Sequence, residues 1–130
     1  MAIDPNSPVP IYQQIADDIR RSVAAGVYQS AEMLPSLRAL AVQLTVNPNT
    51  VQRAYDELVR EGVLYAKRGM GLFVAEQGAE LARNKSEDVL YQTFKRAILE
   101  GKTANLSGQQ IGGIFQRALA STETKTRRKS

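Results

Sequence analysis

Hydrophobic side chains recur at helical spacing over residues 10–25. They follow the series i, i+3, i+4, i+7 and i+11, which predicts an amphipathic helix with one buried face. This stripe consists of Tyr12, Ile15, Ala16, Ile19 and Val23. Pro10 suits the first turn of such a helix, and Gly26 can adopt the left-handed conformation that ends it. Arg20 and Arg21, with the aspartates beside them, are expected on the solvent side.

Two shorter amphipathic helices are predicted after a connector at 27–34, which has room for one short strand. Ser36 is a good N-cap for the first of them, and Asn47 followed by Pro48 is a typical start of the second. The inward stripes are Leu37, Leu40, Ala41 and Leu44 in the first helix, and Val51, Ala54, Tyr55, Leu58 and Val59 in the second. Because only a short turn at 45–46 separates them, the pattern predicts a helix-turn-helix unit.

Two short apolar runs, 63–66 and 72–74, follow these helices. The segment between them, Arg-Gly-Met-Gly at 68–71, has the glycine content of a tight turn. The pattern therefore predicts a β-hairpin, or wing, with Lys67 and Arg68 near its tip.

The chain becomes more polar after the hairpin. Segment 76–86 is either a linker or the first turns of a long helix, and Ser107 with Gln110 resembles a capping box for a last helix. The apolar stripes are Leu90, Phe94, Ala97 and Ile98 in the helix before this box, and Ile111, Ile114, Phe115, Ala118 and Leu119 after it. The polar, basic tail at 122–130 is expected to be disordered.

These patterns predict a mainly α fold with a small β-wing. A winged helix-turn-helix domain would occupy 1–75 and a C-terminal helical region 76–121, with the tail at 122–130. The net charge of +4 suits a polyanionic partner without identifying one. The N-terminus does not resemble a signal peptide and no segment reaches membrane-spanning length, so we expect a cytoplasmic protein with no membrane partner.

The residue types argue against catalysis. The chain contains no Cys and no His, which removes thiolate zinc sites and the commonest general base and metal ligand. The glycines at 69–71 are not followed by the helix that a dinucleotide site requires. The carboxylate pairs Asp17-Asp18 and Asp56-Glu57 are neighbours on helix surfaces and point in divergent directions, so we interpret them as solvated. The sequence predicts no enzyme, metal or cofactor.

The outer face of the helix at 48–60 suggests a different chemistry. A helix fits the major groove of DNA, where Asn and Gln can bond adenine and Arg can bond guanine. The exposed N-terminal positions carry Asn49, Thr50, Gln52 and Arg53. Arg38 on the preceding helix can reach a base or phosphate, and Lys67 and Arg68 suit the adjacent backbone or minor groove. Each feature alone is ordinary for a solvated surface, but their coincidence favours binding of double-stranded DNA.

The same segment resembles a known family. It carries Leu-Pro-Ser-x-Arg-x-Leu-Ala at 34–41, Val-Asn-Pro-Asn-Thr-Val-x-Arg-Ala-Tyr at 46–55 and Glu-Gly at 61–62. In these motifs residues 9–74 resemble the winged helix-turn-helix domain of GntR-family bacterial transcription regulators. The Asn-Pro-Asn-Thr-Val run and the short C-terminal part resemble the YtrA subfamily, in which two C-terminal helices serve dimerisation.

The resemblance implies DNA contacts from Arg38 and from the helix at 48–60 with its cap, at Asn47, Asn49, Thr50, Gln52 and Arg53. It also implies contacts from Arg68 and Gly69 at the wing tip. The chain departs from the family at two places. Ser30-Ala31 stands where the family usually has Pro-Gly, and Ala39 replaces the acidic residue that commonly follows the arginine.

We therefore expect a homodimeric regulator, most simply a repressor, that binds an inverted-repeat operator. The C-terminal stripes carry more apolar surface than one hairpin can bury, and two-fold dimers are the commonest assembly. The residues expected at the dimer interface are Leu90, Phe94, Ile98, Ile111, Ile114, Phe115 and Leu119. A small-molecule effector stays open as a further partner. One alternative is a DNA-independent interaction module. The other is the head of an aminotransferase-like fusion, but the chain leaves no room for that enzyme.

Overall fold

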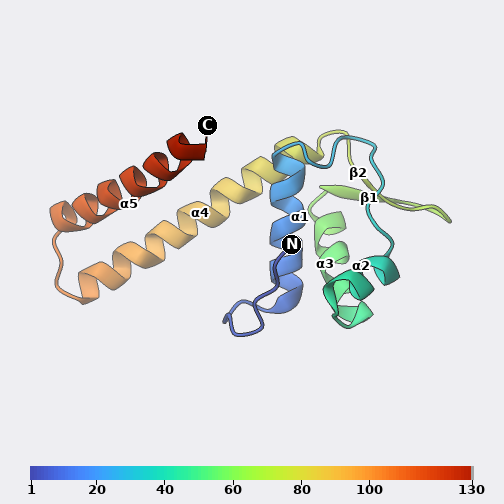
Figure 1. Ribbon diagram of the computed structural model, residues 1–130, viewed down its shortest axis with the longest axis horizontal. Coiled ribbons are helices and arrows are strands. Elements are labelled where there is room, and N and C mark those ends of the chain that lie inside the picture. Colours follow the sequence, from blue (N-terminus) through green and yellow to red (C-terminus); the bar gives the residue numbers. More distant parts are fainter. Residues whose placement is uncertain (130) are drawn as a thin grey trace. The chain divides into compact units, whose positions relative to one another are not determined.

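The computed structural model describes residues 1–129, with only the backbone described from 124 on; Ser130 lies outside the described residues. The elements, in chain order, are α1 (Ile11–Ala24), α2 (Leu37–Leu44), α3 (Pro48–Arg60), β1 (Leu64–Lys67), β2 (Gly71–Val74), α4 (Gly78–Thr103) and α5 (Gly108–Lys129) (Figure 1). They form two compact units, Met1–Asp88 and Val89–Ser130. The mainly helical fold with a two-stranded wing confirms the predicted fold class.

The core of the first unit lies between the three predicted helices. α1 and α2 both pack against α3, so the apolar stripes of all three helices meet (Figure 1). The buried members of the stripes are Ile15, Ala16, Ile19 and Val23 of α1, Leu40 and Ala41 of α2, and Val51, Ala54, Tyr55 and Leu58 of α3. Burial of these faces locks α3 in one rotation about its axis, which decides the side chains it presents to solvent.

Both short helices begin as the capping signals predict. The Ser36 hydroxyl accepts a hydrogen bond from the Ala39 amide at 3.1 Å, and the Asn47 side chain accepts one from the Asn49 amide at 2.8 Å. Between them Thr45 adopts a left-handed conformation with φ of 56°. Each cap satisfies a backbone amide that the helix itself leaves unpaired, which fixes where the helix starts.

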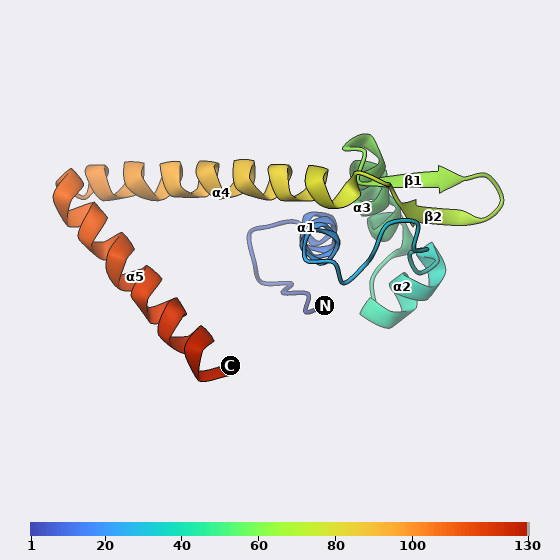
Figure 2. The same cartoon turned by 90° about the horizontal axis from the view of Figure 1, so that it is seen from above.

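The wing is an antiparallel hairpin in which Leu64 pairs with Val74 and Lys67 with Gly71. The connector before α2 lies along β2, where Met33 forms an isolated bridge with Phe73 and the Leu34 amide donates to the Leu72 carbonyl at 2.8 Å. This bridge is all that forms of the short strand allowed for at 27–34. Figure 2 shows the hairpin extending beyond α2 and α3.

The turn that departs from the family pattern is held by Ala31. Its φ is 67°, a left-handed conformation, and its amide donates to the Val74 carbonyl at 2.9 Å. A non-glycine residue in this region costs about 1–2 kcal/mol. The departure noted in the sequence thus places alanine where the backbone favours glycine.

Replacing Ala31 with glycine is therefore expected to raise the free energy of unfolding by about 0.5–1 kcal/mol, because relief of the strain exceeds the added chain entropy. Urea denaturation followed by circular dichroism measures the change. Ala25→Gly is the matched control, since Ala25 is also exposed but has a φ of −85°. It should be destabilising, and an equal response at both positions would contradict the explanation.

The structure corrects the expectation for Arg20, which was placed on the solvent side. Only 3% of this residue is exposed. Its guanidinium donates two hydrogen bonds to the Glu61 carboxylate, at 2.9 and 2.7 Å, and one to Asp17 at 2.7 Å. Burial alone lowers the pKa of Arg20, but the two carboxylates outweigh it and the pKa is raised. The prediction failed because Glu61 lies 41 positions away in sequence.

The sequence left segment 76–86 as either a linker or the first turns of a long helix. It forms the first turns of a long helix, because α4 begins at Gly78. A Cβ at Gly78 would lie 2.7 Å from the Val63 carbonyl oxygen, so glycine permits this close approach. Ala82 of the same helix belongs to the core of the first unit. The division between the two units therefore falls within α4, after Asp88, beyond the boundary at 75 that the sequence suggested.

The second unit is a helical hairpin. Ser107 and Gln110 form the predicted capping box, with reciprocal hydrogen bonds of 2.8 and 3.1 Å. α5 continues to Lys129, over a stretch whose polar, basic composition predicts disorder. No glycine or proline occurs after Gly113 to end the helix, and Lys, Arg and Glu are good helix formers.

The hairpin leaves its apolar stripes open to solvent. Six of the seven residues expected at a dimer interface are 41–51% exposed and Ile111 is half-buried. Phe94 and Phe115 meet edge to face with ring centroids 5.6 Å apart. Beside them lies an apolar groove of about 670 Å³, whose lining includes Ile98, Leu106 and Ile111.

None of the described helices combines the length and apolar character needed to cross a membrane.

Candidate nucleic-acid interface

The outer face of α3 presents the polar residues that the sequence pattern predicts there. Asn49, Gln52 and Arg53 are exposed, and Thr50 is half-buried. The opposite face carries the buried Val51 and Leu58. A helix with one face locked in the core and polar, adaptable side chains on the other can enter the major groove without unfolding any part of the domain.

The two neighbouring side chains of this face are both held by intramolecular contacts. The Gln52 amide nitrogen donates to an Asp56 carboxylate oxygen at 2.7 Å, one helical turn further along. The Arg53 guanidinium lies over the Tyr12 ring of α1, 3.9 Å from its centroid, in a cation–π contact. Such contacts restrict the rotamers of long side chains and so reduce the entropy lost when they bind a partner.

Asn47 has a structural task at the start of α3. Its side-chain oxygen caps the helix through the Asn49 amide, and its side-chain NH₂ remains available to a partner. The exposed start of the helix also offers backbone amides and the positive end of the helix dipole, which favour a phosphate group. Asn47 therefore combines a capping role with a position at the candidate interface.

The wing tip is a tight turn closed by a hydrogen bond from the Met70 amide to the Lys67 carbonyl at 2.9 Å. Gly69 has a φ of 78°, a conformation that favours glycine, and no atom lies within 4 Å of where its Cβ would be. Lys67 and Arg68 are exposed, and the Lys67 ammonium lies 5.2 Å from the centroid of the Phe73 ring. The tip thus presents two cations on a short, defined support.

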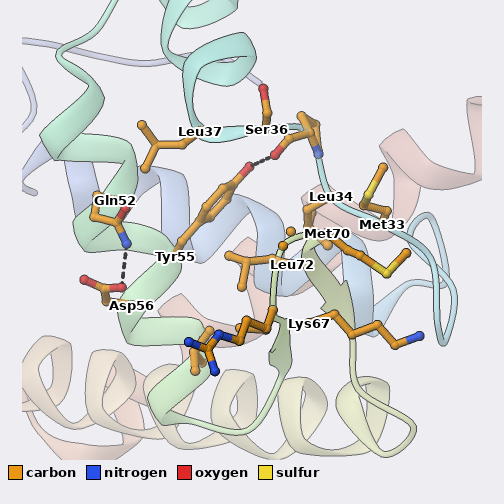
Figure 3. A pocket seen from close by; sticks show the side chains of 16 residues that line it. Met33, Leu34, Ser36, Leu37, Gln52, Tyr55, Asp56, Lys67, Met70 and Leu72 are labelled. Atoms are coloured by element: carbon orange, nitrogen blue, oxygen red, sulfur yellow. Dashed lines mark hydrogen bonds between the residues drawn. The ribbon is translucent and has the colours of Figure 1, made fainter.

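A groove of about 640 Å³ joins α3 to the wing (Figure 3). Gln52 and Asp56 line it from the helix, and Lys67, Arg68 and Gly69 line it from the hairpin. The structure therefore brings four of the nine predicted contact residues to one groove: Gln52, Lys67, Arg68 and Gly69. The other five lie outside its lining: Arg38, Asn47, Asn49, Thr50 and Arg53.

Tyr55 fixes one wall of this groove. Its hydroxyl donates to the Pro35 carbonyl at 2.8 Å and ties α3 to the chain entering α2 (Figure 3). Burial raises the pKa of Tyr55, and the neighbouring Tyr28 raises it further. Both effects disfavour the phenolate, so the neutral phenol, which can donate the hydrogen bond to Pro35, is the favoured form.

Sequence reasoning missed two residues of the site. Asp56 was interpreted as part of a solvated face, although it lies four positions after Gln52, a spacing at which Gln and Asp side chains meet on a helix. Tyr12 was assigned only to the apolar stripe of α1, and no local signal relates it to Arg53, 41 positions away. The first contact could have been found from spacing, whereas the second depends on the packing of α1 against α3.

Comparison with known proteins finds a relative that is similar over most of the chain. Residues 11–74 match the family model described as bacterial regulatory proteins, gntR family. The HTH-type transcriptional repressor YtrA of Bacillus subtilis (strain 168) is 32% identical over 109 residues, 84% of this chain and 84% of YtrA.

Solved structures are similar as well. A GntR family transcriptional regulator from Listeria monocytogenes has a TM-score of 0.72 at 32% identity, covering 88% of this chain and 98% of that chain. AraR(DBD), solved in complex with operator ORE1, has a TM-score of 0.51 at 28% identity, covering 57% of this chain and 90% of that chain.

Proposed function

The chain belongs to the gntR family of bacterial regulatory proteins, and from this premise we propose that it is a repressor that binds an inverted-repeat operator as a homodimer. Membership makes it a DNA-binding transcription regulator, and the YtrA protein it resembles is a repressor. The observation that carries the proposal is the exposed polar face of α3 beside a cationic wing tip.

The proposed DNA contacts fall into two groups. Those of α3 and the neighbouring helix would reach base edges or phosphates in the major groove: Arg38, Asn47, Asn49, Thr50, Gln52 and Arg53. Lys67, Arg68 and Gly69 of the wing would follow the adjacent backbone or minor groove. The resemblance to AraR(DBD), which was solved with an operator, supports DNA binding by this domain.

The exposed apolar surface of the second unit supports the proposed dimer. Phe94, Ile98 and Ile114 are each more than 40% exposed, and surface of this kind is usually covered by a partner. A second copy can cover it symmetrically, and a two-fold dimer would place two α3 helices on half-sites about 34–36 Å apart or a multiple of this distance. An effector is not required by this proposal.

DNA selected from a random pool, followed by titration at several salt concentrations, tests the proposal. If a dimer neutralises some six to ten phosphates, log K should fall against log salt with a slope of about −5 to −9. Gln52→Ala should relax base preference by about 1–3 kcal/mol at one position of each half-site, whereas Lys67→Ala should weaken binding evenly. No selected sequence and no salt dependence would instead favour a protein interaction module.

A further inference from the structure

Gln52 and Asp56 form a fixed pair on the exposed face of α3. The Gln52 Nε2 donates to Asp56 Oδ1 at 2.7 Å, and both residues line the groove toward the wing (Figure 3). An ionised carboxylate accepts hydrogen bonds and donates none, so only the nitrogen of the carboxamide can face it. The carbonyl oxygen of Gln52 must therefore point away from Asp56, and the carboxylate decides which way round the amide lies.

No cation among the described side chains forms an ion pair with Asp56. The ion pairs in the described part of the chain involve Arg20 and Arg21, and Asp56 belongs to none of them. Lys67 and Arg68 line the same groove, and neither forms an ion pair with Asp56. Asp56 is itself exposed. Among the side chains that the structure describes, through residue 123, the Asp56 carboxylate hydrogen-bonds Gln52 alone.

We propose that Asp56 is a positioning residue that makes Gln52 select adenine and reject guanine at one base pair of each half-site; this rests on the proposed function. In the fixed orientation Gln52 offers one acceptor, Oε1, and one remaining N–H. Adenine presents the matching amino donor at N6 and acceptor at N7. Guanine presents two acceptors, N7 and O6, so one of them would face the Gln52 oxygen or the Asp56 carboxylate.

The variants at Asp56 separate orientation from charge. Asp56→Ala removes the partner and lets the carboxamide rotate. Asp56→Asn goes further, because an asparagine NH₂ can donate to Gln52 Oε1 and turn both Gln52 N–H groups toward guanine. Asp56→Glu keeps an acceptor-only carboxylate one turn from Gln52 and should rescue the preference. Asp18→Asn, the same charge change on α1 outside the groove, is the matched control.

The experiment uses the full chain and the operator selected by the wild-type protein. The base pair read by Gln52 is the one at which Gln52→Ala loses discrimination. At that pair the ratio of binding constants for adenine and guanine operators is measured by fluorescence anisotropy. Asp56→Ala and Asp56→Asn are expected to lower this ratio about five- to tenfold, a part of what a bidentate base contact provides. Asp56→Glu and Asp18→Asn should keep it within about twofold.

The outcomes distinguish a failure of this inference from a failure of the proposed function. If Asp56 acted only through its negative charge, removing it would strengthen binding to all operators alike and leave the adenine-to-guanine ratio unchanged. That result would overturn the positioning role alone. A wild-type chain that selects no sequence would overturn the proposed function and the role of Asp56 with it. Circular dichroism of each variant checks that α3 remains folded.

Discussion

Replacing Glu61 with alanine should lower the free energy of unfolding by about 3–5 kcal/mol, the cost of leaving one partner of a buried ion pair without its counter-charge. Arg20 is 3% exposed and Glu61 17%, and two hydrogen bonds join the guanidinium to the carboxylate. Without Glu61 the guanidinium keeps Asp17 alone, through a single contact of 2.7 Å. Urea denaturation at a fixed protein concentration measures the change, since self-association also shifts stability.

The next arginine along α1 provides the control for this prediction. Arg21 is 67% exposed and contacts Asp18 at 3.5 Å, so Arg21→Ala should change stability by no more than about 0.5 kcal/mol. The two arginines share a helix and a charge and differ in burial and geometry. A loss below about 1 kcal/mol for Glu61→Ala would show that water replaces the carboxylate, and the ion pair would then not be a main support of the α1–α3 packing.

Local patterns in the sequence were sufficient to predict α1, α2, α3 and the wing, whereas the first turns of α4 were left open and the last turns of α5 were expected to be disordered. The capping residues Ser36 and Asn47 begin α2 and α3 as expected, and the apolar stripes fix the buried faces. What depends on distant contacts was not predictable in this way. Arg20 has the character of a surface residue until Glu61 is brought beside it, and the Glu-Gly motif at 61–62 gives no sign of this partner.

In the candidate site, too, local patterns predicted some features while others depended on distant contacts. Helical periodicity was enough to place Asn49, Gln52 and Arg53 on the exposed face of α3. The orientation of these side chains is a tertiary property: Arg53 lies on Tyr12 because α1 packs against α3. The left-handed turn at Ala31 was anticipated only as a departure from the family pattern, and its backbone conformation identifies it as a strained position.

Replacing Phe94 with glutamate should abolish the proposed dimer and weaken operator binding about a hundredfold or more, because each half-site would then be bound without the effective concentration that a linked second domain provides. Phe94 is 43% exposed on the apolar stripe of α4 and meets Phe115 edge to face. A charge placed there would be buried against a second copy with no partner. Light scattering reports the assembly, and anisotropy reports binding to the full and half operators.

Gln92→Glu introduces the same side chain two positions away in α4, about 160° around the helix from Phe94, and should leave both assembly and binding unchanged. The Phe94→Glu protein should bind a single half-site about as well as the wild-type protein does, since the first unit has its own core. If Phe94→Glu remained dimeric, the apolar stripe would not be the interface. If it became monomeric but kept full operator affinity, dimerisation would not be the source of that affinity.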